Sequence, residues 1–230
     1  MKEMFTITYT FSLNQSQQIT IPIEIDEENL LLLNRPSQNS DWCKLEFMQC
    51  PNCPLSTQHV KYCPAATAIQ DLIDHFRNTV SFDECYVEVQ VKERTYSKKT
   101  SFQEALRSIL GIYMPVSGCP NLAWLKPMAR FHLPFSSTKE TLFRVVGTYL
   151  TGQYVRQLNG EEADLNLKGL KLLYEKVHTV NIAFSARLRS AINKDAAANS
   201  LVILDIFSQS VPFSIDRSLS ELSPFFKPYL

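Results

Sequence analysis

The chain has 230 residues, of which 45% are hydrophobic and 20% charged, proportions typical of a globular protein with a sizeable core. Its 23 Lys and Arg residues balance its 23 Asp and Glu residues, so the net charge is zero. A broad nucleic-acid surface normally carries a basic excess, so the sequence predicts no nucleic-acid partner. No apolar run reaches the roughly 18–20 residues of a membrane span, and we expect a cytoplasmic protein without a membrane partner.

The N-terminal part of the chain alternates apolar and polar side chains with a period of two. In residues 5–11 and again in residues 19–25, every second side chain is Phe, Tyr or Ile. This period predicts two antiparallel strands with one buried face. Pro22 has no N–H to donate to a neighbouring strand, so the second strand is expected to leave one edge unpaired there.

Three more segments have strand patterns, namely residues 42–48, 84–91 and 94–98. With the first two strands they predict an antiparallel sheet of about five strands, with one helix over residues 64–80 inserted between them. Cys43 and Cys85 fall on the inward faces of these strands. A free cysteine there behaves as a small hydrophobic residue, so we expect both in the core.

After Thr100 the pattern becomes helical. Ser101 with Glu104, and Ser137 with Glu140, form capping-box patterns that predict helix starts before residues 102–113 and 138–158. Further helices are predicted over 166–194 and 196–210, with a last turn or two over 218–226. The predicted fold is therefore α+β, with a sheet region in 1–100 and an all-helical region in 101–230, although one continuous domain fits equally well. The wide apolar helix faces are compatible with a dimer.

Four of the six cysteines are each followed by proline and lie outside the predicted strands, namely Cys50, Cys53, Cys63 and Cys119. In a reducing compartment, clustered cysteines are better explained by metal or redox chemistry than by disulfides. A C-x-x-C pair aims two sulfurs at one point, and two further thiolates complete a tetrahedral site. We therefore predict a structural zinc site with these four cysteines as ligands, in a protein with a binding or regulatory role.

Several alternatives remain open at this stage. His132 is the substitute ligand if Cys119 does not join the other three cysteines. The same cysteines could hold an iron–sulfur cluster, because proline also follows ligand cysteines in bacterial ferredoxin motifs. A third hypothesis is a cysteine-dependent enzyme that pairs Cys119 with His132. The partner would be an unidentified protein or small molecule.

One irregular segment, residues 118–135, is rich in proline and aromatic residues and contains Arg130 and His132. Such segments often line a binding or catalytic site. The equally strong alternative is a buried connector that packs Trp124, Met128 and Phe131 against the sheet.

Four short motifs together resemble an uncharacterised family of bacterial proteins, namely C-P-N-C-P-L, Y-C-P-A-A, S-G-C-P and P-M-A-R-F-H-L-P-F. The resemblance spans most of the chain but implies no activity and no catalytic residues. Locally, C-P-x-C also resembles the knuckle of rubredoxins and zinc ribbons. The chain departs from that knuckle at Pro54, where the motif usually has a glycine in a left-handed conformation.

Overall fold

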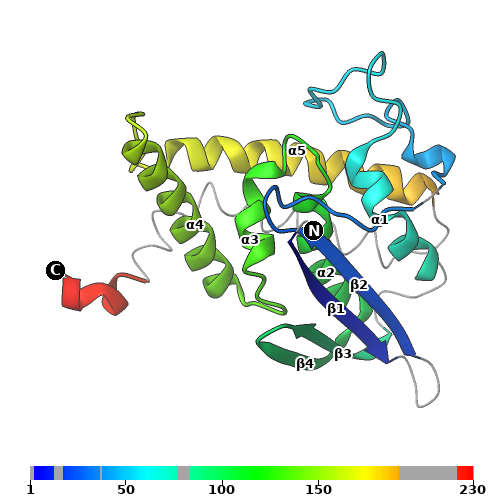
Figure 1. The fold of residues 1–230 in the computed structure, drawn as a ribbon, viewed down its shortest axis with the longest axis horizontal. Helices are drawn as coiled ribbons and strands as arrows, with labels where there is room; N and C mark the ends of the chain where they lie inside the picture. The colour runs from blue at the N-terminus through cyan, green and yellow to red at the C-terminus, as the bar shows by residue number, and fades with distance from the viewer. Residues whose placement is uncertain (1–2, 13–17, 37, 77–82, 192–221, 230) are drawn as a thin grey trace.

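The computed structural model describes residues 3–12, 18–36, 38–76, 83–191 and 222–229 (Figure 1). It confirms the α+β class, with a four-stranded antiparallel sheet instead of five strands. The strands are β1 (Met4–Ser12), β2 (Gln18–Asp26), β3 (Glu84–Val91) and β4 (Arg94–Ser101). The α-helices are α1 (Pro64–His75), α2 (Phe102–Val116), α3 (Lys126–Arg130), α4 (Thr138–Leu158) and α5 (Lys168–Ala191), and the short 3₁₀ helices are η1 (Asp41–Cys43), η2 (Ala123–Leu125) and η3 (Ser223–Tyr229).

The period of two places one face of the sheet in the core. The strand order is β2-β1-β3-β4, and Tyr9 of β1 lies opposite Ile21 of β2 and Val89 of β3. All three side chains are buried. β2 is an edge strand, which confirms the prediction from Pro22.

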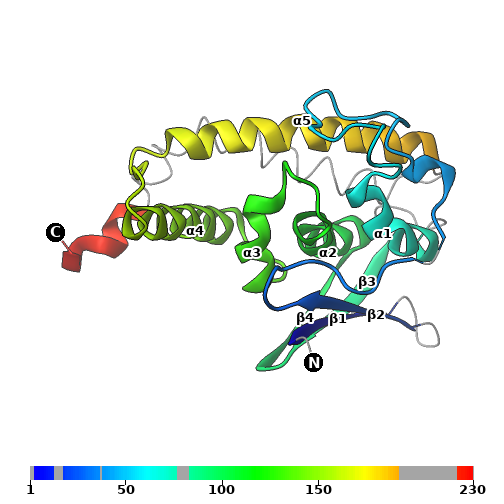
Figure 2. The same ribbon diagram turned by 45° about the horizontal axis from the view of Figure 1, so that its top comes forward.

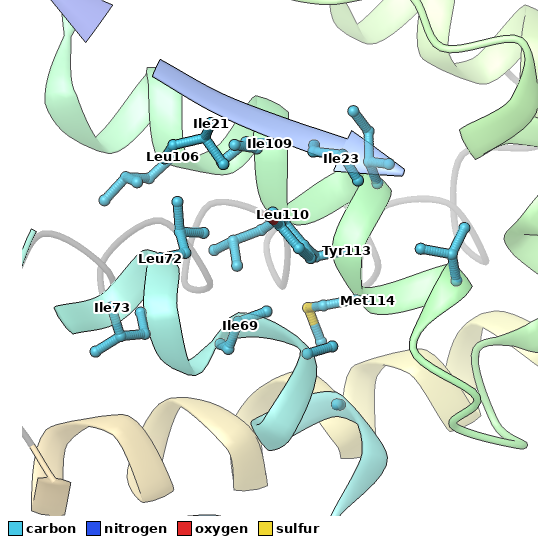
Figure 3. Packing of buried hydrophobic residues seen from close by; sticks show 14 of the residues in the cluster. Ile21, Ile23, Ile69, Leu72, Ile73, Leu106, Ile109, Leu110, Tyr113 and Met114 are labelled. Carbon is cyan, nitrogen blue, oxygen red and sulfur yellow. The ribbon is translucent and has the colours of Figure 1, made fainter. Parts of the chain in front are cut away.

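The helices form two layers on the buried face of the sheet. Figure 2 shows α1 and α2 between the sheet and the long α5. In the close view of Figure 3, Ile21 of β2, Ile69 of α1 and Leu110 of α2 meet in one cluster. Each such side chain contributes roughly 1.5–3 kcal/mol when it is fully buried. The same cluster includes Phe184 of α5, so the main core combines residues from both sides of Thr100, and the domain boundary there stays a prediction.

The predicted strand over residues 42–48 is wrong. This segment begins with η1 and continues in turns, ending with Met48 at a φ of 48°. Cys43 is nevertheless buried as predicted, as is Cys85 in β3, and Leu45 of the same turn segment is buried too.

The two capping-box predictions have different outcomes. At α4, Ser137 and Glu140 form the complete box. At α2, Ser101 precedes the helix, but its side chain makes no cap hydrogen bond. Glu104 instead pairs with Arg107 at 2.8 Å, which removes the carboxylate that would complete the box. α2 also continues three residues beyond its predicted end, to Val116.

Other predicted helix ends fall partly outside the described residues. α1 ends at His75, and α5 is described to Ala191. The helix predicted over 196–210 lies outside the described residues, and the turn predicted over 218–226 is described only from Leu222 onward, where η3 follows. On α4, the apolar side chains of Phe143 and Val155 are exposed, and the dimer stays a prediction. Within the described parts of the chain, no helix combines the length and apolarity needed to cross a membrane.

A buried arginine joins α5 to the turn segment after η1. Arg187 is only 1% exposed, and its Nη1 donates to the carbonyl oxygens of Trp42 at 2.9 Å and Lys44 at 2.8 Å. Its Nη2 donates to the carbonyl of Leu45 at 3.3 Å. Successive carbonyls of an extended strand point in opposite directions, so Lys44 and Leu45 can serve one guanidinium only in a turn. This contact explains why residues 42–48 are not a strand.

Replacing Arg187 is expected to destabilise the whole protein. Arg187→Met keeps an apolar side chain of similar length but removes the donor to three carbonyl groups. Among the described residues, Lys44 keeps a second donor, the N–H of Phe47, whereas Trp42 and Leu45 lose the one that Arg187 supplies. We expect the free energy of unfolding, measured by urea denaturation, to fall by about 2–4 kcal/mol. The control Arg189→Met changes an exposed arginine on the same helix and should stay within about 0.5 kcal/mol of the parent. Equal effects of the two substitutions would contradict the role of Arg187.

Candidate functional site

A cavity of about 150 Å³ lies between α2, α3, α4 and α5, and we call it the helical cavity. Most of its wall is apolar, and the apolar lining includes Leu110, Met114, Leu125, Met128 and Val177. A smaller set of polar side chains also lines it, including Ser108, His132, Arg144 and Tyr174. Apolar walls with a few convergent polar groups are the usual composition of a small-molecule site.

The cavity exists because α2 lacks a filling side chain at its wall. Gly111 lines the cavity, and a Cβ added there would have no atom within 4 Å. Pro115, one turn later on the same face, also lines the cavity. Pro115 has no N–H, so the helical hydrogen bond to the carbonyl of Gly111 cannot form. The cavity wall on α2 therefore combines an open space with a weakened helical turn.

The irregular segment 118–135 both lines the cavity and acts as a connector. It folds into η2 and α3, and its residues Leu125, Met128 and His132 line the cavity. Trp124 packs edge-on against Tyr174 of α5 with ring centroids 5.3 Å apart. The hypothesis that this segment lines a site agrees with the cavity lining. The packing expected of a buried connector is wrong for Phe131, which is 72% exposed, and Trp124 packs against α5.

A chain of hydrogen bonds runs from the cavity wall into the sheet. Ser108 Oγ lies 2.7 Å from Tyr9 Oη, and Tyr9 Oη lies 2.7 Å from His132 Nε2. The backbone N–H of Phe135 donates to Ser108 Oγ at 3.4 Å. When each hydroxyl donates once, Ser108 donates to Tyr9, Tyr9 donates to His132 Nε2, and the imidazole carries its proton on Nδ1.

This hydrogen-bonded chain is electrically neutral at physiological pH. Burial, with a smaller contribution from the charge of Arg144, lowers the pKa of His132 to about 3. Burial raises the pKa of Tyr9 well above its ordinary value, so Tyr9 keeps its proton. The chain positions His132 and Ser108 without adding a charge to the cavity.

Arg144 of α4 brings a positive charge to the wall. Its Nη2 donates to the carbonyl oxygens of Met128 at 2.9 Å and Phe131 at 2.7 Å. Burial lowers the pKa of Arg144 from its ordinary value. Arg144 and His132 also line a second cavity of about 630 Å³ against β1 and the β3–β4 hairpin, which we call the sheet-edge cavity. These two residues thus lie in the wall between the two cavities.

The predicted zinc site is wrong. Among the described residues, which include all six cysteines, no group of three or more His, Cys, Asp or Glu side chains could hold a metal ion. Burial raises the pKa of Cys50 to about 12, and the neighbouring thiols of Cys63, Cys119 and Cys53 add to this shift. Burial also raises the pKa of Cys119 to about 11. The iron–sulfur alternative requires the same group of cysteine ligands and is overturned with the zinc site.

The Cys-Pro motifs instead form a junction between loops. Cys53 N–H donates to the Cys50 carbonyl at 3.0 Å, which makes the C-P-N-C segment a turn. Within this turn, Asn52 Nδ2 donates to the carbonyl of Lys176 in α5, and the carbonyl of Asn52 accepts from Asn121 Nδ2, both at 3.0 Å. The motifs therefore connect residues 50–53 with the loop after Cys119 and with α5.

The cysteine-dependent enzyme is also overturned. The side-chain hydrogen-bond partner of His132 in the described residues is Tyr9, not Cys119. A cysteine nucleophile needs a lowered pKa, and burial raises that of Cys119. His132 as a substitute metal ligand fails with the metal site.

Comparison with known proteins places the chain in one family. It matches the family described as a domain of unknown function (DUF6901) over residues 7–227. The chain belongs to this family. No curated protein and no solved structure matches it. For this DUF6901 chain, the geometry of the helical cavity is therefore the strongest guide to function.

The sequence reasoning identified His132 but missed Ser108, Gly111 and Arg144. One signal was present, because Gly111 interrupts the apolar face of a predicted helix and Pro115 follows it by one turn. A glycine inside a helix is unfavourable by roughly 0.5–1 kcal/mol relative to alanine, so its presence there indicates a packing or functional reason.

We predict that the neutral state of His132 makes stability fall in acid. Its folded pKa of about 3 lies below the ordinary value of 6.5, so the unfolded chain binds the proton first. The stabilisation is complete above pH 6.5 and is lost as pH falls toward 3. Between pH 7 and pH 4, the free energy of unfolding measured by urea denaturation should fall by about 3 kcal/mol more in the parent than in His132→Gln. Tyr9 and Arg144 remain in both proteins, so the difference between them reports on residue 132. If the free energies of unfolding of the two proteins changed in parallel with pH, the prediction would be refuted.

Gly111→Ala is expected to stabilise the protein. The new methyl group enters open space in the cavity, and alanine favours the helix over glycine. We expect the free energy of unfolding to rise by about 0.5–1 kcal/mol. The contrasting variant is Gly169→Ala in α5, where an added Cβ would clash with Tyr149 Oη and stability should fall. A loss of stability in Gly111→Ala would show that the wall has no such space.

Proposed function

We propose that this protein binds a small organic molecule with an apolar body in the helical cavity. The observation that carries the proposal is the cavity itself, about 150 Å³ in volume and mostly apolar in its wall. Apolar cavities of about this size accept a ring the size of benzene. The small-molecule partner is therefore the one that the site supports.

The chemistry of the surrounding residues supports binding over redox or metal chemistry. His132 and Tyr9 are neutral and hydrogen-bonded to each other, which suits a fixed wall. All six cysteines are free thiols, and this supports a cytoplasmic location for the protein. A fixed wall with an apolar interior recognises a ligand mainly by shape.

The test uses benzene as a neutral probe on the full-length chain. Benzene at about ten times its Kd should raise the thermal unfolding midpoint by about 2–4 °C. Gly111→Leu places an isobutyl group in the cavity and should abolish this increase. The matched control Gly152→Leu, at an exposed α4 position where an added Cβ also meets nothing within 4 Å, should respond like the parent.

Two outcomes would refute the proposed function. One is no response of the parent to benzene at any soluble concentration. The other is an equal response of Gly111→Leu and the parent, because the probe would then bind outside the helical cavity.

A further inference from the structure

Among the described residues, Arg144 is a positively charged side chain that has no carboxylate within hydrogen-bond distance. Arg107, Arg130 and Arg156 each lie within 4 Å of a glutamate carboxylate, at 2.8, 2.8 and 3.1 Å respectively. In the part of the chain that the structure describes, no carboxylate lies within that distance of Arg144, although it lines the helical cavity. Among the described residues, the groups that meet this charge at hydrogen-bond distance are therefore backbone carbonyls.

The guanidinium of Arg144 is held in a fixed position. Its Nη2 is used by the carbonyls of Met128 and Phe131, at the end of α3. Its Nε and Nη1 make no hydrogen bond to any described residue, so their N–H groups remain as donors. A guanidinium held in this way loses little conformational entropy when it binds an anion.

Burial makes an anionic partner favourable at this position. Desolvation lowers the pKa of Arg144, which means that the protein holds this charge at a cost. A carboxylate that acts on this charge, that of Glu140, is exposed and accepts hydrogen bonds from Ser137 in the capping box. A ligand carboxylate beside Arg144 would supply the missing countercharge inside the partly desolvated wall.

We infer that the ligand of the helical cavity is a small carboxylic acid, bound as its anion, with the carboxylate on Arg144 and the apolar body among Leu110, Met114 and Val177. This inference rests on the proposed function and specifies its ligand class. One guanidinium balances the single charge of a carboxylate. Arg107 also lines the cavity, but its charge is balanced by Glu104 at 2.8 Å. The wall groups His132 and Ser108 are neutral and provide polar contacts beside Arg144.

The first experiment compares three probes on the unmodified full-length chain by isothermal titration calorimetry. Benzoate carries the carboxylate, benzamide has nearly the same shape without the charge, and benzene has the ring alone. A charge-assisted hydrogen bond predicts a Kd for benzoate about ten- to hundredfold lower than that for benzamide. Gly111→Leu fills the helical cavity and should abolish binding of benzoate. Benzoate bound at the sheet-edge cavity would instead be unaffected by this substitution, so the variant distinguishes the two locations.

The second experiment tests Arg144 directly. Arg144→Met should reduce the affinity for benzoate to that for benzamide while binding of benzene persists. The control Arg156→Met, on the same helix but paired with Glu161 outside the cavity, should leave all three affinities unchanged. If Arg144→Met fails to fold, the comparison of benzoate with benzamide on the parent decides the question alone.

The outcomes separate the inference from the proposed function. Equal affinities for benzoate and benzamide, with benzene bound, would overturn the carboxylate and leave a neutral-ligand site. Binding of benzoate that survives Gly111→Leu would overturn it as well. Failure of all three probes to bind would overturn the proposed function itself.

Discussion

The hydrogen bonds of Arg187 to the backbone of residues 42–45 fix α5 against the rest of the molecule. The guanidinium reaches carbonyls that only a turn can bring together, so the contact determines both the conformation of that segment and the position of the helix. α5 also contributes Tyr174 and Val177 to the helical cavity. Val177 lies about 15 Å along the helix axis from Arg187, so the cavity wall depends on an anchor well away from it.

Much of the sheet could be predicted because its determinant is local. The period of two in residues 5–11, 19–25 and 84–91 is sufficient to identify strands that pack one face on helices. Residues 42–48 have a similar pattern, but their conformation is set by Arg187, more than 140 residues away in the chain. The two capping boxes show the same limit at shorter range, since Arg107 takes the carboxylate of Glu104 at α2 while no such competitor acts on Glu140 at α4.

The site was harder to predict because an empty volume has no sequence pattern of its own. Gly111 and Pro115 are visible in the sequence, yet a gap forms only because the side chains of the surrounding helices leave the space beside Gly111 open. The Cys-Pro motifs led to the opposite error, because they predicted a metal site that the described residues do not form. Proline after cysteine also favours turns, and here the turn at residues 50–53 joins loops through Asn52, while burial raises the pKa of Cys50 and Cys119.

The helical cavity divides its recognition properties between two helices. Its open space lies beside a position of α2 that has no side chain, and Arg144 of α4 contributes a positive charge to its wall. Substitution at residue 111 fills the space and leaves this charge in place, whereas substitution at residue 144 removes the charge and leaves the space beside Gly111. Selectivity for size and selectivity for charge can in this way evolve, or be engineered, one at a time.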